Sequence, residues 1–164
     1  MNGYAQMKKV STQIVLVIIR IKTPAVSGKE RMMKKWTEEE LIESGYKIQN
    51  AKITNADLST ESYCCCDFPI TLDGDGWGVV YGGYVLGKGG TSYKNIDDIE
   101  GTEMGMKAIL TIMRVVGVDS LNDMKGKYVR VATKGWGDTV KIIGNITKDE
   151  WFDYGTFFKE ASNE

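Results

Sequence analysis

Residues 70–81, "ITLDGDGWGVVY", predict a β-hairpin. Apolar residues alternate with polar ones before two consecutive Asp-Gly pairs, and a second apolar segment follows them. An Asp-Gly pair between such segments is the strongest short-range hairpin signal, because both positions of the tight turn call for positive φ. We therefore expect one strand over 62–72, a turn at 73–76 and a second strand over 77–86.

The segment 101–117, "GTEMGMKAILTIMRVVG", is the one strong amphipathic helix of the sequence. Thr102 is placed to cap its N-terminus and Gly117 to end it. Its apolar residues follow helical spacing, at Met106, Ile109, Leu110, Met113 and Val116. Methionine fills irregular gaps in protein cores, so we interpret these methionines as core residues and not as a binding face.

Shorter signals place the remaining elements. Thr37 and Glu40 form a capping box, and Gly45 can end the helix that follows. This helix is predicted over 38–44. Alternating apolar residues and turn-forming residues predict a strand over 46–53 with a turn at 55–57, and strands over 127–132 and 139–146 joined by "KGWGD". The aromatic end, "DEWFDYGTFF", is expected to fold back on the sheet as a short helix or turn. The predicted fold is α+β, a mainly antiparallel sheet of about five strands with the 103–116 helix on one face.

The 164 residues, 42% of them apolar, can bury one core. We expect a single domain over 33–164, preceded by an N-terminal extension over 1–32. Translation is expected to begin at Met32 or Met33, because "KER" before them can be encoded by purine-rich codons. The apolar run "IVLVII" at 14–19 is far shorter than the roughly 20 residues that a membrane-spanning helix needs, so no membrane association is expected.

The composition narrows the possible chemistry. The chain contains no histidine, which excludes Ser-His-Asp and Cys-His nucleophile pairs and every zinc site that uses imidazole. The three cysteines are contiguous, at 64–66, and fit no metal-binding spacing. We interpret them as small buried residues in a strand of a cytoplasmic protein. We therefore predict no catalytic residue, no metal site and no cofactor.

The glycine-rich stretch 73–90 partly matches three phosphate- or metal-binding motifs, and each match fails at a defined position. A P-loop would begin at Gly82, but Gly89 stands where Ser or Thr must bind magnesium. A calcium loop would begin at Asp73, but Trp77 occupies a ligand position. The third glycine of a dinucleotide motif is replaced by Val79. A metal-dependent hydrolase that uses carboxylates of the acidic segment 57–103 remains a third possibility.

The candidate binding residues are aromatic and acidic. Rings flanked by glycine can stack on a nucleobase or on a partner's side chain, although the tryptophans can equally belong to the core. The candidate rings are Trp77, Tyr81, Tyr84 and Trp136. The candidate acids are Asp73 and Asp75 at the hairpin turn, and Asp97, Asp98 and Glu100 before the long helix.

Four stretches carry a family resemblance. They are "GYKIQNAKITNADLS", "ITLDGDGWGVVYGGYVLGKG", "GMKAILTIMRVVGVDSLNDMKGKYVRVATKGWG" and "VKIIGNITKDEWFDYGTFF". Together, over about 45–158, they resemble a family of small proteins of phages and prophages of gut Firmicutes. The resemblance implies a genomic context, an accessory protein of a mobile element. It transfers no activity and no site residue.

Two functional hypotheses follow. The first is a non-enzymatic binder that inhibits a host macromolecule, such as an anti-CRISPR or other anti-defence protein, with a nucleic-acid-binding defence protein of the host as partner. Direct nucleic-acid binding is not expected, because 21 basic residues are balanced by 22 acidic ones. The alternative is a small-ligand or nucleotide binder, a sponge for a signalling molecule, built on the aromatic-glycine hairpins.

Overall fold

The computed structural model describes residues 35–59, 67–82, 86–88, 100–135 and 137–161. All of them belong to one compact unit, Met32–Glu164. The predicted extension, 1–32, and the three cysteines lie outside the described residues. The boundary between extension and domain therefore stays a prediction.

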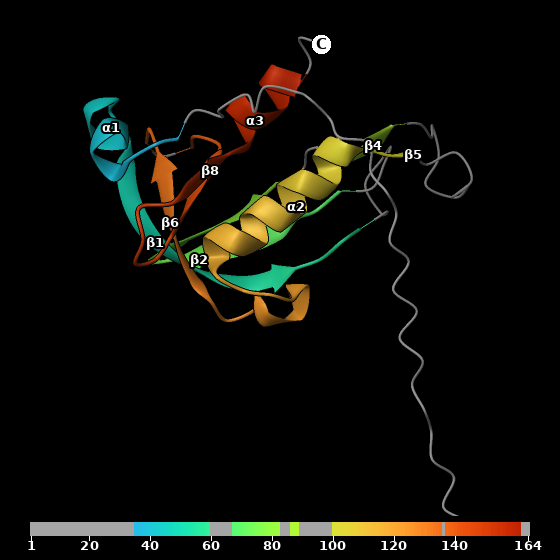
Figure 1. The fold of residues 1–164 in the computed structure, drawn as a ribbon. Helices are drawn as coiled ribbons and strands as arrows, with labels where there is room; N and C mark the ends of the chain where they lie inside the picture. Colours follow the sequence, from blue (N-terminus) through green and yellow to red (C-terminus); the bar gives the residue numbers. More distant parts are fainter. Residues whose placement is uncertain (1–34, 60–66, 83–85, 89–99, 136, 162–164) are drawn as a thin grey trace, which may run out of the picture. The chain divides into compact units, whose positions relative to one another are not determined.

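The architecture is α+β, as predicted, and its main element is a six-stranded antiparallel sheet (Figure 1). The order of its strands is β3 (Trp77–Tyr81), β2 (Ile70–Gly74), β1 (Lys47–Ala56), β6 (Tyr128–Thr133), β7 (Ile142–Asn145) and β8 (Trp151–Asp153). A separate two-stranded sheet pairs β4 (Gly87–Lys88) with β5 (Glu100–Gly101). The helices are α1 (Glu38–Glu43), α2 (Glu103–Val116) and α3 (Tyr154–Ala161), with a short 3-10 helix at Leu121–Asp123. The sheet thus has one strand more than expected, because the segment "WFD" adds to its edge as β8.

The predicted hairpin is confirmed as the pair β2–β3, with Asp75 and Gly76 in its turn. The expectation of positive φ at both turn positions was wrong, since only Gly76 adopts it, at 76°. β2 begins at Ile70, after Pro69, which has no N–H for a ladder, and residues 62–66 of the predicted strand lie outside the described residues. β3 ends at Tyr81, where Gly82 has a φ of 109° and passes close to the Phe68 carbonyl.

Strand β1 replaces the turn predicted at 55–57. It continues to Ala56, and its pairing with β2 shifts in register between Ile53 and Asn55. Such a bulge bends a strand without ending it. The predicted strands 127–132 and 139–146 are confirmed as the hairpin β6–β7, although β7 is shorter than expected.

Glycine lies where an aromatic ring crosses the sheet, as the glycine density suggested. Gly74 and Gly144 each face a tryptophan on the neighbouring strand, Trp77 and Trp151 respectively. A Cβ atom at either glycine would overlap that ring. The absence of a side chain therefore lets each ring lie flat on the strand beside it.

Helix α2 lies over one face of the sheet (Figure 1). Thr102 accepts a hydrogen bond from the Gly105 N–H at 3.1 Å, and Gly117 ends the helix with a φ of 82°, as predicted. The buried residues of α2 are Gly105, Ala108, Ile109, Ile112, Val115 and Val116. The expectation that Met106 belongs to the core was wrong, because it is 58% exposed, and Leu110 of the same apolar stripe is 57% exposed. The apolar stripe of α2 is wider than the part that the sheet covers.

The other face of the sheet carries α1. Ala132 and Ile142 alternate with the residues that face α2, so they point to the opposite side, where they pack with Leu41 of α1. The capping box of Thr37 and Glu40 is present in full. At the C-terminus, Phe157 of α3 packs on Phe152 of β8 with ring centroids 5.1 Å apart. Two apolar layers therefore hold the sheet from both sides.

Candidate functional site

The predicted rings are only partly available on the surface. Trp77 is half-buried and packs against the main core. Tyr81 is fully buried, its ring is 5.5 Å from that of Tyr154, and its hydroxyl donates to the Lys141 carbonyl at 3.4 Å. Tyr81 is therefore a core residue and offers no stacking surface.

The predicted acids lie in two different places. Asp73 and Asp75 are exposed at the β2–β3 hairpin. Glu100 is exposed in β5, which pairs with β4 and not with the main sheet. The remaining candidates, Tyr84, Trp136, Asp97 and Asp98, lie outside the described residues. Whether Trp77 and Trp136 share one face accordingly stays a prediction.

The described residues hold neither a candidate metal cluster nor a helix that could span a membrane. No three Asp, Glu, Cys or His side chains in this part of the chain are grouped so that they could hold a metal ion. None of the described helices is long and apolar enough to span a bilayer. The site is therefore sought among surface hollows and exposed side chains.

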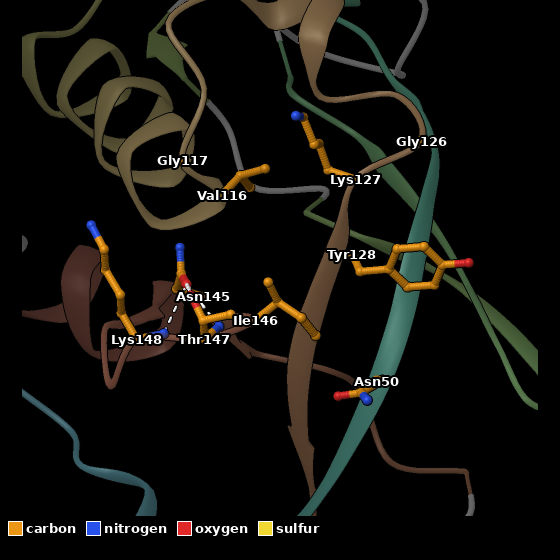
Figure 2. Close-up of a pocket in the computed structure, with 10 residues that line it drawn as sticks. All are labelled: Asn50, Val116, Gly117, Gly126, Lys127, Tyr128, Asn145, Ile146, Thr147 and Lys148. Carbon is orange, nitrogen blue, oxygen red and sulfur yellow. Dashed lines mark hydrogen bonds between the residues drawn. The ribbon is translucent and has the colours of Figure 1, made fainter.

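A hollow of about 700 Å³ lies between the end of α2, the start of β6 and the turn from β7 to β8 (Figure 2). We call it the lysine hollow. Its lining residues are Asn50, Val116, Gly117, Gly126, Lys127, Tyr128, Asn145, Ile146, Thr147 and Lys148. No sequence pattern predicts it, because its lining comes from four segments that are far apart in the chain.

Asn145 organises one wall of the lysine hollow. Its side-chain N–H donates to the carbonyl of Val115 at 2.8 Å, and its side-chain oxygen accepts from the N–H groups of Thr147 and Lys148, both at 2.9 Å. The side chain is buried, so these bonds exchange little with water. Asn145 thus ties the end of α2 to the β7–β8 turn.

Arg130 holds the same turn from the other face of the sheet. Its Nε donates to the Asn145 carbonyl at 2.7 Å, and its terminal nitrogens bind the Lys148 carbonyl and the Glu38 carboxylate. Its guanidinium also lies 4.5 Å from the ring centroid of Trp151. With Asn145, this arginine fixes the backbone from which the Lys148 side chain projects.

The polar ends of four lining side chains face no partner within the described residues. They are the ammonium groups of Lys127 and Lys148, the hydroxyl of Tyr128 and the amide of Asn50. No carboxylate lines the lysine hollow. Tyr128 and Ile146 add apolar surface, since they are 53% and 39% exposed. A lining with two cations, an exposed aromatic ring and no carboxylate suits an anion with a flat apolar part.

The outer face of α2 is the second candidate. Met106 and Leu110 are one helical turn apart, and half-buried Met113 continues their row. A hollow of about 400 Å³ adjoins this row, lined by Leu110, Met113, Arg114, Gly117, Val118 and Asp119. We call this surface the α2 outer face. Sequence reasoning found Met106, Leu110 and Met113 at helical spacing and assigned the two methionines to the core.

Two tyrosines have a raised pKa. Burial, and secondarily the carboxylates of Asp153 and Asp138, raises the pKa of Tyr46. Burial, and secondarily Asp153, raises the pKa of Tyr154. Neither tyrosine lines the lysine hollow or the α2 outer face, so these shifts bear on stability and not on binding.

Comparison of the chain with models of protein families, with curated proteins and with solved structures returned no match. The resemblance to phage and prophage proteins is untested by these comparisons. The function is therefore argued from the geometry of the two candidate surfaces.

Proposed function

We propose that the chain is a non-enzymatic binding protein that covers a surface of a host macromolecule, with the α2 outer face as its contact surface. The observation that carries this proposal is the exposure of Met106 and Leu110, at 58% and 57%, on one row of a well-formed helix. Single exposed apolar residues are ordinary on proteins, whereas neighbouring ones beside a hollow mark interaction sites. A row with helical spacing is also how helices anchor in a partner's groove.

The charges around this row indicate the chemistry of the partner. Lys107 and Arg114 are exposed on either side of Leu110, and Glu100 and Glu103 are exposed near the start of α2. A partner that fits would present an apolar patch with acids opposite the basic end and bases opposite the acidic end. Such a pattern sets the orientation of a complex more than its affinity.

The family resemblance supports the biological part of the proposal. We propose that the chain is an accessory protein of a phage or other mobile element, and that its target is a defence protein of the host cell. The acids Asp97, Asp98 and Glu100 suit a target whose own surface is basic because it binds nucleic acid. In this mechanism the chain inhibits by occupying that surface.

The test measures capture of a defined partner. The tagged chain is used as bait in a lysate of a gut Firmicutes host, the recovered protein is purified, and its Kd is measured. Leu110→Glu places a charge in the contact and is expected to weaken binding at least tenfold, as burial of an unpaired charge does. Reversal of Asp97, Asp98 and Glu100 to lysine is expected to weaken it further at low salt.

Ile42→Glu is the matched control, because Ile42 is 57% exposed on a different helix, α1. It is expected to bind like the wild type. Equal binding by Leu110→Glu and the wild type would exclude the α2 outer face. Equal loss in Leu110→Glu and Ile42→Glu would point to general destabilisation and count against a specific contact.

The lysine hollow favours a second function, the binding of a nucleotide or a related small anion. The specific observation is that two lysines and the exposed Tyr128 line one hollow, with no carboxylate in the lining. The hollow also has a volume typical of small-molecule sites. Nucleotides at millimolar concentration should raise the Tm of the wild type by mass action, and Lys127→Ala/Lys148→Ala should remove the rise. An unchanged Tm with every nucleotide would exclude this function.

A further inference from the structure

Strand β3 forms one edge of the main sheet. It pairs with β2 on one side, and none of the described strands pairs with it on the other. The two-residue turn makes Gly74 and Trp77 a hydrogen-bonded pair, and such pairs alternate along an antiparallel ladder. The N–H and C=O groups of Gly78 and Val80 therefore point away from β2.

This edge lacks the usual protections against pairing. Natural edges carry charged residues, proline or bulges. β3, "WGVVY", has no charged residue and no proline, and its register with β2 is regular. Its composition is instead that of a good strand, with valine and aromatic residues. The edge is thus a template for another strand.

We propose that β3 pairs with β3 of a second copy of this chain, antiparallel and centred on Val79. In this register Gly78 lies opposite Val80 of the second copy, and the reverse pair follows by symmetry. These are the two residues of each copy whose backbone groups point outward. The register therefore forms two hydrogen-bonded pairs, and the central valines form the pair between them.

The side chains fit the same register. Val80 is 57% exposed, although β-branched residues normally pack on a neighbour, and Gly78 offers bare backbone. Gly78 and Val80 lie on one face of β3, so each Val80 would cover the Gly78 opposite it. A self-complementary edge of this kind is what a two-fold symmetric contact requires, which is why we assign the edge to a second copy.

The symmetry has a consequence for the α2 outer face. Residues opposite each other in an antiparallel pair point to the same face, so the two-fold axis is perpendicular to the sheet. Six strands from each copy would form one continuous sheet, and both α2 helices would lie on the same side of it. The dimer would present two copies of the α2 outer face to one partner. A contact of one strand is small beside the roughly 1,200 to 2,000 Å² of stable complexes, so we expect dissociation in the micromolar range or above.

The test combines sedimentation equilibrium with amide hydrogen exchange of the full chain. The average mass should rise with concentration, and the Gly78 and Val80 amides should exchange more slowly as it does. Val80→Pro removes an outward N–H that β2 does not use, and Val80→Lys adds a charge to the edge. Both variants should remain monomeric at every concentration, with circular dichroism confirming the fold. The control Ile42→Lys, with equal exposure on α1, should dimerise like the wild type.

Two results would overturn the inference. Fast exchange of both amides and a monomer mass at all concentrations would mean that the edge stays unpaired. Slow exchange with a monomer mass would mean that another segment of the same chain occupies it. Because Val80→Pro leaves the α2 outer face unchanged, a monomeric variant that still captures the partner separates this inference from the proposed function.

Discussion

The two edges of the main sheet are built in opposite ways. At the β8 edge, Asp153 accepts hydrogen bonds from Trp36 at 3.1 Å and from the Gly155 N–H at 2.9 Å, which joins the sheet to the start of α3. At the β3 edge, Tyr81 packs on Tyr154 and donates to the Lys141 carbonyl, but none of the described strands pairs with the outward backbone groups of Gly78 and Val80. One edge is closed by its own chain, whereas the other remains available to a second one. The difference separates the part of the sheet that is internally stabilised from the part that can bind.

The largest loss of stability should come from substitution of Asn145, which lies beside the closed edge. Asn145→Ala leaves the Val115 carbonyl and the Thr147 and Lys148 N–H groups without their partner. Each lost bond to a buried group costs about 1–3 kcal/mol, and water can replace part of it at the turn. We expect a loss of about 3 kcal/mol in the free energy of unfolding, measured by urea denaturation. A loss below about 1 kcal/mol would show that the closed edge does not depend on this residue.

Replacing glycine by alanine in the two glycine–tryptophan pairs should cause smaller losses of stability, and the two losses should differ. A methyl group at Gly144 meets the Trp151 ring, which is held by its hydrogen bond to Asp149 and by Arg130. A methyl group at Gly74 meets the Trp77 ring, which no hydrogen bond within the described residues restrains and which can move outward at the open edge. Overpacking costs about 1–3 kcal/mol where neighbours cannot move.

We therefore expect Gly144→Ala to lower the free energy of unfolding by about 2 kcal/mol and Gly74→Ala by less than about 1 kcal/mol. Chemical denaturation of both variants under one set of conditions gives the comparison. Equal losses would contradict the idea that the two edges differ in rigidity.

The smallest expected effect is a loss of folding stability at alkaline pH. The pKa values of Tyr46 and Tyr154, which lie toward the closed edge, are raised in the folded state. The fold therefore favours the neutral phenols. Their contribution is fully present below the unfolded pKa of about 10 and is lost as the pH rises through the folded pKa.

Thermal unfolding between pH 9 and 11 tests this contribution. The Tm of Tyr46→Phe/Tyr154→Phe should fall less steeply with pH than that of the wild type. Tyr128→Phe, which alters a 53% exposed tyrosine, is the matched control and should follow the wild type. An equally steep fall in the double variant would remove these tyrosines as the cause.

Sequence reasoning found the elements whose signals are local. The hairpin turn at 75–76, the capping box of Thr37 and Glu40, and the ends of α2 at Thr102 and Gly117 all depend on residues within a few positions of each other. It missed β8 because the three residues "WFD" become a strand only when β7 lies beside them. It also misplaced the core face of α2, since an apolar residue does not reveal which side the sheet covers.

Most of the candidate site could not be predicted from the sequence. Of its predicted residues, Asp73, Asp75 and Glu100 are exposed, Trp77 is half-buried and Tyr81 is in the core. The lysine hollow joins residues 50, 116–117, 126–128 and 145–148, and no pattern in the chain connects them. The α2 outer face was visible as methionine and leucine at helical spacing, but its exposure was not.

The sequence by itself determined the class of fold, the main hairpins and the one long helix, because turns, caps and apolar periodicity act over short distances along the chain. Only the tertiary structure decided which apolar residues are covered, which edge of the sheet is closed and which four segments line the lysine hollow. Those properties depend on contacts between segments 30 or more residues apart, such as Asn145 with Val115, and packing alone brings such residues together.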